Sequence, residues 1–212
     1  MKYFIVNADK SRQDNVDLMV NFLGEDRINC ESVHSDDLNS FYSKNYRFVV
    51  TGDKINTSEV GCFASHYNGW KYVVENDLES LLIIEDDSTI ESSFIDELNY
   101  FTKFLPKDYD TFFVYYDAEM SKLFKFSRDY IGNDFICKAY QNWSTQCYLI
   151  SNRGAKKLIE LTHEYGMTRP VDNFMLNFGE QDILKNYAPM PPRSIKIFIN
   201  KDYPTTIRRG NE

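Results

Sequence analysis

The segment of residues 81–87 constrains this chain most, because a wholly apolar run ends abruptly in three acidic residues, Glu85, Asp86 and Asp87. A short run of leucine and isoleucine without polar interruption is typical of a strand buried on both faces. Burying even one unpaired charge is costly, so adjacent carboxylates at the end of such a strand require a compensating group. A divalent cation would provide it, since hard cations prefer oxygen ligands.

The alternation of side chains along a strand makes this hypothesis more specific. Residues two apart in a strand point the same way, so Glu85 and Asp87 are expected to face one ion or ligand while Asp86 faces the other side. The alternative is an acidic turn on the surface. The surrounding α/β pattern favours a ligand site, because ligands in open α/β sheets bind beyond the carboxyl ends of the strands.

A helix is predicted immediately before this strand. Thr57 or Ser58 is expected to cap it, and Glu59 lies in its first turn, where a negative charge suits the helix dipole. The apolar stripe of this helix recurs at helical spacing and comprises Val60, Phe63, Tyr67, Trp70 and Val74.

The remaining pattern predicts alternating strands and helices, and therefore an α/β fold. Strands are expected at residues 3–7, 30–33, 111–116, 135–140 (as part of a hairpin), 144–151 and 195–199. Helices are expected at residues 15–23, 92–104 and 155–165, the last with Gly166 as its C-cap. Residues 36–51 show no clear pattern, and residues 117–133 are interpreted as a loop over the site. No glycine-rich phosphate loop follows the first strand, so neither a dinucleotide-binding fold nor a P-loop enzyme is supported.

Composition limits the class of protein. The 212 residues predict one domain, residues 1–212, and the net charge of −8 argues against general attraction to nucleic acid or anionic membrane. Residues 193–209 are nevertheless basic, which is compatible with a docked phosphate-bearing ligand and equally with a solvated end. Cys62 and Cys147 are expected to be buried thiols, and no cysteine spacing resembles a zinc site. Without a signal peptide or an apolar segment of about 20 residues, the expected location is the cytoplasm.

A family resemblance rests on the central helix and strand together. Residues 58–67 read Ser-Glu-Val-Gly-Cys-Phe-Ala-Ser-His-Tyr, followed by Trp70 and then by the Ile-Glu-Asp-Asp of residues 84–87. They resemble glycosyltransferase family 25, the lipooligosaccharide galactosyltransferases and their collagen-modifying relatives, with its Gly-Glu-Ile-Gly-Cys-Phe-Leu-Ser-His-Tyr helix and its Leu-Glu-Asp-Asp strand end. The Thr-x-x-Tyr-Leu-Ile-Ser of residues 145–151 and the Pro-Val-Asp of residues 170–172 also match.

The resemblance implies a single-domain GT-A-like fold, a Rossmann-type mixed sheet flanked by helices. It also implies a metal-dependent transferase that moves a sugar from a UDP-linked nucleotide-sugar to an acceptor hydroxyl of a saccharide or lipooligosaccharide, with inversion. Glu85 and Asp87 would then bind Mn²⁺ or Mg²⁺, and Asp86 would lie toward the ribose or sugar. No histidine follows His163, so phosphates, water or a carboxylate must complete the metal sphere.

The donor side is expected to include the first loop and the matched helix. Asn7, Asp9 and Arg12 fall on the family's first-loop pattern, although Ala8 replaces the usual leucine and Arg12 comes later than the family's arginine. Arg12 is a candidate contact to the diphosphate or base, with a solvent-exposed loop arginine as the alternative. His66 is a candidate donor contact, with a packed, hydrogen-bonded core histidine as the alternative.

The catalytic base is expected to be a carboxylate, because inversion proceeds without a covalent intermediate. Asp172 is the first choice, and Glu180 and Asp182 are its rivals because GT-A enzymes often place a catalytic acid on a late helix. The alternative role for Asp172 is that of a helix N-cap after Pro170.

Other functions remain open at this point. A phage-type transferase that modifies hydroxymethylated bases in DNA would suit the basic tail but not the overall acidity. A non-catalytic protein that binds a nucleotide-sugar would keep the fold without turnover. A calcium module built on Asp86, Asp87 and Glu91 does not have EF-hand spacing, and a two-carboxylate glycoside hydrolase has no matching motif.

Overall fold

The computed structural model describes residues 1–7, 9–115, 134–139, 144–190, 193–200 and 202–203. A mixed six-stranded sheet forms its centre, in the order β1-β2-β6-β4-β7-β5. The strands, in that order, are Tyr3–Val6, Ser80–Glu85, Cys147–Ser151, Thr111–Phe113, Asn186–Pro189 and Ile136–Lys138.

Strand direction decides which residues meet at each end of the sheet. β1 and β2 run parallel, with Val6 opposite Glu85. β6 runs antiparallel to β2, with Cys147 opposite Ile84. The residues just before β6 therefore lie at the carboxyl end of β2, beside the acidic cluster.

A small second sheet brings the C-terminal segment to the same end. β3 (Ser88–Ile90) pairs antiparallel with β8 (Ile197–Ile199). Just after β8, the Asn200 amide donates to the Asp87 carbonyl at 2.7 Å.

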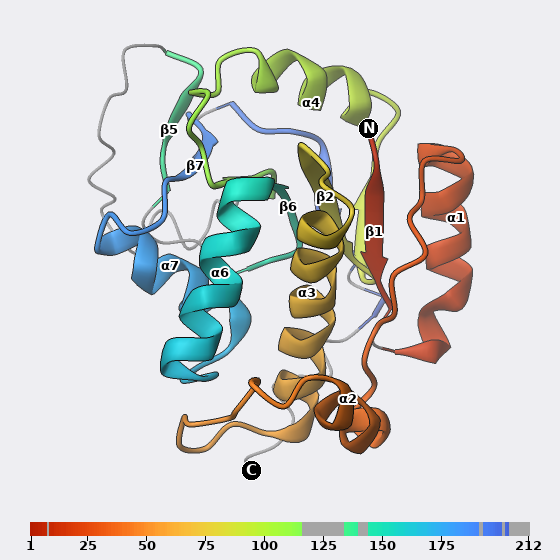
Figure 1. The fold of residues 1–212 in the computed structure, drawn as a ribbon. Helices are drawn as coiled ribbons and strands as arrows, with labels where there is room; N and C mark the ends of the chain where they lie inside the picture. The colour runs from red at the N-terminus through yellow and green to blue at the C-terminus, as the bar shows by residue number, and fades with distance from the viewer. Residues whose placement is uncertain (8, 116–133, 140–143, 191–192, 201, 204–212) are drawn as a thin grey trace.

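Helices cover both faces of the large sheet (Figure 1). One face carries α3 (Thr57–Glu75), α6 (Asn152–Tyr165) and α7 (Val171–Glu180), whose apolar residues share one core cluster. The other face carries α1 (Gln13–Leu23) and α4 (Phe94–Thr102), which share a second cluster. The short helices are η1 (Lys10–Arg12), η2 (Ser35–Asp37) and α2 (Leu38–Lys44).

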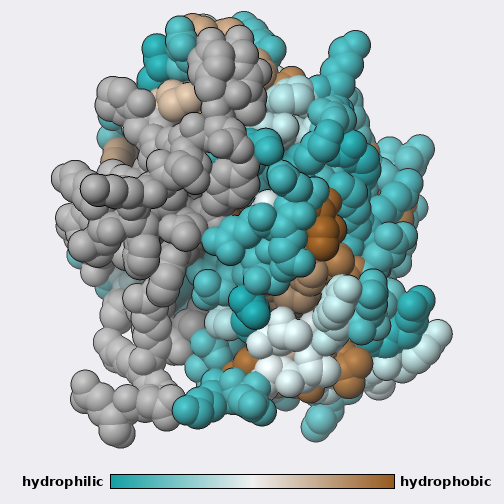
Figure 2. All heavy atoms as spheres, turned by 90° about the vertical axis from the view of Figure 1, so that its left-hand side faces the viewer, coloured by the Kyte–Doolittle hydropathy of each residue, from teal (hydrophilic) through white to brown (hydrophobic). Residues whose placement is uncertain are grey.

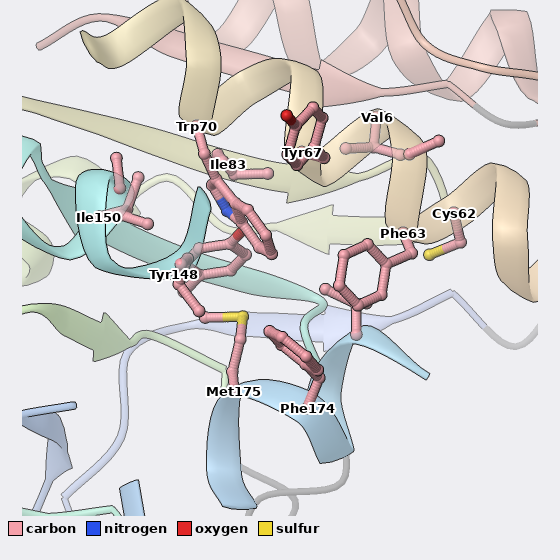
Figure 3. Packing of buried hydrophobic residues seen from close by; sticks show 14 of the residues in the cluster. Val6, Cys62, Phe63, Tyr67, Trp70, Ile83, Tyr148, Ile150, Phe174 and Met175 are labelled. Atoms are coloured by element: carbon pink, nitrogen blue, oxygen red, sulfur yellow. The ribbon is translucent and has the colours of Figure 1, made fainter. Parts of the chain in front are cut away.

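Aromatic side chains fill the core under α3 (Figure 3). Trp70 and Phe63 are fully buried, as the apolar stripe predicts, and their rings are 5.6 Å apart in an edge-to-face arrangement. Phe174 of α7 meets Phe63 at 5.1 Å. Such pairs contribute about 0.5–1.5 kcal/mol beyond area burial, so they help to hold α3 against α7 on this face of the sheet.

The predicted α/β fold, a mixed sheet flanked by helices, is confirmed. The central helix and strand are found where expected, and Gly166 caps α6 with φ +71° and an amide bond to the Thr162 carbonyl. Cys62 and Cys147 are buried free thiols. The described residues contain no helix that is long and apolar enough to span a membrane.

Several local predictions were wrong. The cap of α3 is Asn56, which forms a capping box with Glu59, and neither Thr57 nor Ser58 caps the helix. Residues 30–33 form no strand, because the Val33 amide bonds to the Ser65 hydroxyl at 2.7 Å rather than to a strand.

Other differences arise from long-range pairing. β5 pairs with β7 rather than in a hairpin with a neighbour in sequence. The short strands β3 and β7 had not been predicted, and α7 was expected only as the helix implied by the N-cap alternative for Asp172. The loop expected at residues 117–133 lies outside the described residues, as do Lys201, Arg208 and Arg209 of the basic segment.

The described surface on the side of β5 and α7 is mainly hydrophilic, with small separate apolar areas (Figure 2). Scattered apolar side chains of this kind are normal for a folded surface.

Candidate active site

The three acidic residues at the end of β2 point in different directions. Glu85 lies on the α3 side of the sheet, where it meets His66, and Asp86 lies on the α1 side, where it meets Arg12. Asp87 is in the turn between β2 and β3. Glu85 and Asp86 thus alternate as strand geometry predicts. The expectation that Asp87 shares the face of Glu85 is not met, because Asp87 Oδ2 lies 3.5 Å from the same Arg12 Nη1 that binds Asp86.

Asp86 forms a buried ion pair with Arg12. Arg12 Nη1 donates to Asp86 Oδ1 at 2.6 Å, and the Asp9 amide donates to Oδ2 at 3.0 Å. Burial raises the pKa of Asp86, although Asp9 and Arg12 oppose that shift. Both carboxylate oxygens are therefore engaged, and the first loop after β1 is tied to the acidic strand end.

Asp87 is held less completely. Gln146 Nε2 donates to its Oδ1, and Arg12 Nη1 lies 3.5 Å from Oδ2. Burial and then repulsion from Glu85 raise the pKa of Asp87 to about 6. A charge at Asp87 is thus incompletely compensated by the described residues, which favours an additional cation.

Glu85 accepts a hydrogen bond from Thr145 Oγ1 at 2.6 Å, and His66 Nε2 lies 3.4 Å from the same oxygen, Oε1. Burial alone would raise the pKa of Glu85, but His66, Thr145 and Arg12 outweigh burial and hold the pKa below its ordinary value. Glu85 is therefore ionised at neutral pH and available to a cation.

His66 is fully buried in α3 and lies beside strand β6. Its Nδ1 is 2.9 Å from the Tyr148 hydroxyl, and Trp70 Nε1 donates to that hydroxyl at 2.8 Å. Figure 3 shows Trp70 and Tyr148 side by side. This network fixes the imidazole ring and directs Nε2 toward Glu85.

The sequence profile described as "Glycosyltransferase family 25 (LPS biosynthesis protein)" matches residues 5–175, which include β1, α3 and the acidic strand end. The chain belongs to glycosyltransferase family 25.

Curated relatives of this family 25 chain include animal proteins. It is 29% identical to human procollagen galactosyltransferase 2, over 95% of the chain and 34% of that protein. It is 27% identical to human inactive glycosyltransferase 25 family member 3, over 72% of the chain and 26% of that protein. The chain therefore spans about a third of the length of the first relatives it matches.

Among solved structures, mouse xyloside xylosyltransferase 1 in its apo form aligns with a TM-score of 0.43 and 10% identity, over 96% of this chain and 85% of that chain. A197 from STIV aligns with a TM-score of 0.40 and 14% identity, over the whole of both chains.

The predicted donor residues of this family 25 chain gather at the carboxyl end of β1. Asn7 follows β1 directly, and its Oδ1 is buried without a hydrogen-bond partner among the described residues. Asp9 caps η1 by accepting from the Ser11 amide. Arg12 and His66 flank the acidic cluster from the α1 and α3 sides.

The three candidate bases are separated by the fold. Asp172 is in the first turn of α7, whose N-cap is Pro170, so the N-cap alternative for Asp172 is wrong. Phe174, two residues later on α7, packs against Phe63 of α3 at 5.1 Å, so the start of α7 lies beside the part of α3 that carries Cys62 and His66.

Glu180 and Asp182 are exposed and lie at the other end of α7. Asp182 pairs with Lys138 at 3.0 Å and precedes β7, which starts opposite Thr111 at the edge of the sheet remote from Glu85. The structure therefore brings Asp172 toward the acidic cluster and leaves its two rivals at the opposite edge.

Sequence reasoning missed three polar residues that hold the cluster. Thr145 and Gln146 bind Glu85 and Asp87, and Asn15 Nδ2 donates to the carbonyls of Asp86 and Ser88 at 2.8 and 2.9 Å. Thr145 is the first residue of the matched Thr-x-x-Tyr-Leu-Ile-Ser segment and Gln146 follows it, which was the available signal.

Proposed function

We propose that this chain transfers a sugar from a nucleotide-sugar to an acceptor hydroxyl, with inversion of configuration. We expect the nucleotide-sugar to be UDP-linked. The observation that carries the proposal is the partly compensated acidic cluster of Glu85 and Asp87 at the carboxyl ends of β1 and β2, in a chain of family 25. Transfer from a nucleotide donor requires neutralisation of the departing diphosphate, commonly by a metal ion.

The donor cation, Mn²⁺ or Mg²⁺, would be held by Glu85 and Asp87. Their oxygen donors suit a hard cation, and the ion would relieve the repulsion between them that raises the pKa of Asp87. Phosphate oxygens and water would fill the remaining positions. The cation supplies Lewis-acid stabilisation of the leaving diphosphate when bound.

Arg12 and Asp86 would shape the donor site rather than act on the sugar. Asp86 already uses both oxygens for Arg12 and Asp9, which fixes the first loop beside the cluster. The unpartnered Oδ1 of Asn7 is available to accept from a donor group of the nucleotide. Pre-organised positioning of this kind lowers the barrier without any motion at the moment of reaction.

Asp172 would act as the base that removes the acceptor proton. It is half-buried at the start of α7, and that end of the helix packs against α3 through the contact of Phe174 with Phe63. For the acceptor we propose a saccharide hydroxyl, in keeping with the lipopolysaccharide biosynthesis named in the family description.

A second candidate is a protein that binds a nucleotide-sugar without turnover. It is favoured by one observation, the similarity to a human relative that is named inactive. The two candidates share the donor site and differ only in the chemical step.

One experiment separates them. The purified chain is incubated with Mn²⁺ and each of a panel of nucleotide-sugars, and release of the nucleoside diphosphate is measured with and without saccharide acceptors. We expect Mn²⁺-dependent release from a UDP-sugar, lost in Asp87→Asn and retained in Asp108→Asn, which alters an exposed aspartate paired with Lys185. Binding of the nucleotide-sugar by calorimetry without any release would establish the second candidate, and neither binding nor release would overturn both.

A further inference from the structure

Three side chains with different ligand chemistry converge beside the acidic cluster. Cys62, His66 and Glu85 each offer one ligand atom, and these atoms all lie within 4.8 Å of one another. Cys62 and His66 are one helical turn apart on α3, so both face the end of β2. Figure 3 shows Cys62 beside Phe63 on the helix that carries Trp70.

His66 Nε2 is the second observation that indicates a ligand. It is fully buried and has no hydrogen-bond partner among the described residues, since its distance of 3.4 Å from Glu85 Oε1 is longer than a good hydrogen bond. If Nδ1 carries the ring proton and donates to the Tyr148 oxygen, Nε2 presents a lone pair to this space. The Tyr148 oxygen can accept from both His66 and Trp70, because it has two lone pairs.

The distance of 3.4 Å between His66 Nε2 and Glu85 Oε1 fits two ligands of a tetrahedral metal ion better than it fits a hydrogen bond. Metal–nitrogen and metal–oxygen distances of about 2.0–2.1 Å place two tetrahedral ligand atoms about 3.4 Å apart. This is the distance from His66 Nε2 to Glu85 Oε1. A metal–sulfur distance of about 2.3 Å would place the Cys62 sulfur about 3.5 Å from the other two ligand atoms. Here the three atoms lie within 4.8 Å of one another, so the site would have to contract around the ion.

The surrounding charge is also favourable to a cation. Glu85, Asp172, Asp86 and Asp87 all raise the pKa of Cys62, after the larger effect of burial. The potential at the thiol is therefore negative. The Tyr148 hydroxyl behind His66 is a supporting contact of the kind that orients metal-bound imidazoles.

We propose that Cys62, His66 and Glu85 form a buried binding site for a zinc-class divalent cation, which ties α3 to the end of β2. A thiolate and an imidazole select Zn²⁺ or Co²⁺ over Mg²⁺ and Mn²⁺, so this site differs in chemistry from the oxygen site proposed for the donor cation. Glu85 borders both sites. The proposal does not depend on sugar transfer, because it concerns binding of the cation alone.

The test uses the full chain, stripped with a chelator and titrated with Co²⁺ as a spectroscopic substitute for Zn²⁺. We expect about one equivalent to bind with a thiolate-to-cobalt charge-transfer absorption, and added Zn²⁺ to remove that absorption. We also expect Zn²⁺ to raise the melting temperature of the wild-type chain more than that of Cys62→Ala, whereas any shift caused by Mg²⁺ should be the same for both proteins. A wild-type chain that shows no thiolate absorption with stoichiometric Co²⁺ would overturn the proposal.

Variants assign the ligands. Cys62→Ala should abolish the thiolate absorption, and His66→Gln should weaken Co²⁺ binding about tenfold or more. The matched control is Cys137→Ala, which removes another buried cysteine, on β5 and outside the cluster, and should bind as the wild type does. Absorption that survives in Cys62→Ala would contradict the assignment. If that variant does not fold, the wild-type spectrum and the weakened binding of His66→Gln decide the question, and none of these measurements involves a nucleotide-sugar.

Discussion

Arg12 and Asp86 are 74 positions apart in the sequence, yet Arg12 Nη1 lies 2.6 Å from Asp86 Oδ1 and both side chains are almost fully buried. Positively charged side chains and hydrogen-bond donors from segments distant in sequence therefore compensate much of the negative charge at the end of β2. Asp87 is the residue for which this compensation is least complete.

Loss of the Arg12 side chain should strongly destabilise the fold. In Arg12→Ala, Asp86 becomes a buried charge without its guanidinium partner, and breaking a buried pair typically costs about 3–5 kcal/mol. We expect a decrease of that size in the free energy of unfolding, measured by urea denaturation. The control is Lys44→Ala, which breaks an exposed pair with Glu31 at 3.6 Å and should cost less than about 1 kcal/mol. Equal effects of the two substitutions would contradict this interpretation.

Asp87 should make stability fall as the pH rises from about 4 to about 6. The folded-state pKa is about 6, above that of an unfolded aspartate near 3.9, so the folded protein keeps a proton that the unfolded chain has lost. The free energy of unfolding should therefore decrease through this window, by about 2–3 kcal/mol in total. Denaturation at a series of pH values measures this decrease in the free energy of unfolding. Asp87→Asn should remove the decrease between pH 4 and pH 6. Identical slopes for the two proteins would show that Asp87 is not the group concerned.

Addition of Mn²⁺ should stabilise the wild-type chain more at pH 7 than at pH 5. Below about pH 6 the cation must displace a proton from Asp87, whereas above it the carboxylate is already ionised. The shift in melting temperature with Mn²⁺ at the two pH values measures this, and Asp87→Asn should lose most of the difference. A larger shift at pH 5 would refute the role of Asp87 as a ligand.

Asp172→Asn should reduce the rate of sugar transfer about 10²–10⁴-fold, the usual contribution of a general base, with little effect on donor binding. Asp182→Asn should leave the rate nearly unchanged, because Asp182 is exposed and pairs with Lys138 at the opposite edge of the sheet. Initial rates of diphosphate release and calorimetric donor affinity separate the chemical step from binding. If Asp182→Asn reduced the rate more than Asp172→Asn, the base would be Asp182 instead.

Gly154→Ala should destabilise the chain by about 1–3 kcal/mol or more, because a Cβ at this position would overlap the backbone carbonyl of Asp110. Gly69→Ala provides the comparison, since its Cβ would meet the side-chain ends of Ile83 and Phe4, which can move. Thermal unfolding of both variants measures the contrast. If Gly154→Ala were as stable as Gly69→Ala, the segment at Asp110 and α6 could move apart without loss of stability, contrary to this prediction.

Local patterns were sufficient for the central helix, the buried strand and the acidic residues that follow it. The apolar stripe through Phe63 and Trp70 and the run before Glu85 each express a periodicity carried by neighbouring residues. The short strands β3 and β7 were not predicted because their few residues are strands only by virtue of partners far along the chain.

The sequence by itself determined the α/β class, the family and the carboxylates of the candidate site. Only the tertiary structure decided that Arg12 pairs with Asp86 and that Thr145 and Gln146 hold Glu85 and Asp87. It also decided that the start of α7, with Asp172, packs against α3, whereas Asp182 pairs with Lys138 of β5. These outcomes depend on strand direction and register. Both are set by hydrogen bonds between residues remote in sequence, and no periodicity within a single segment encodes them.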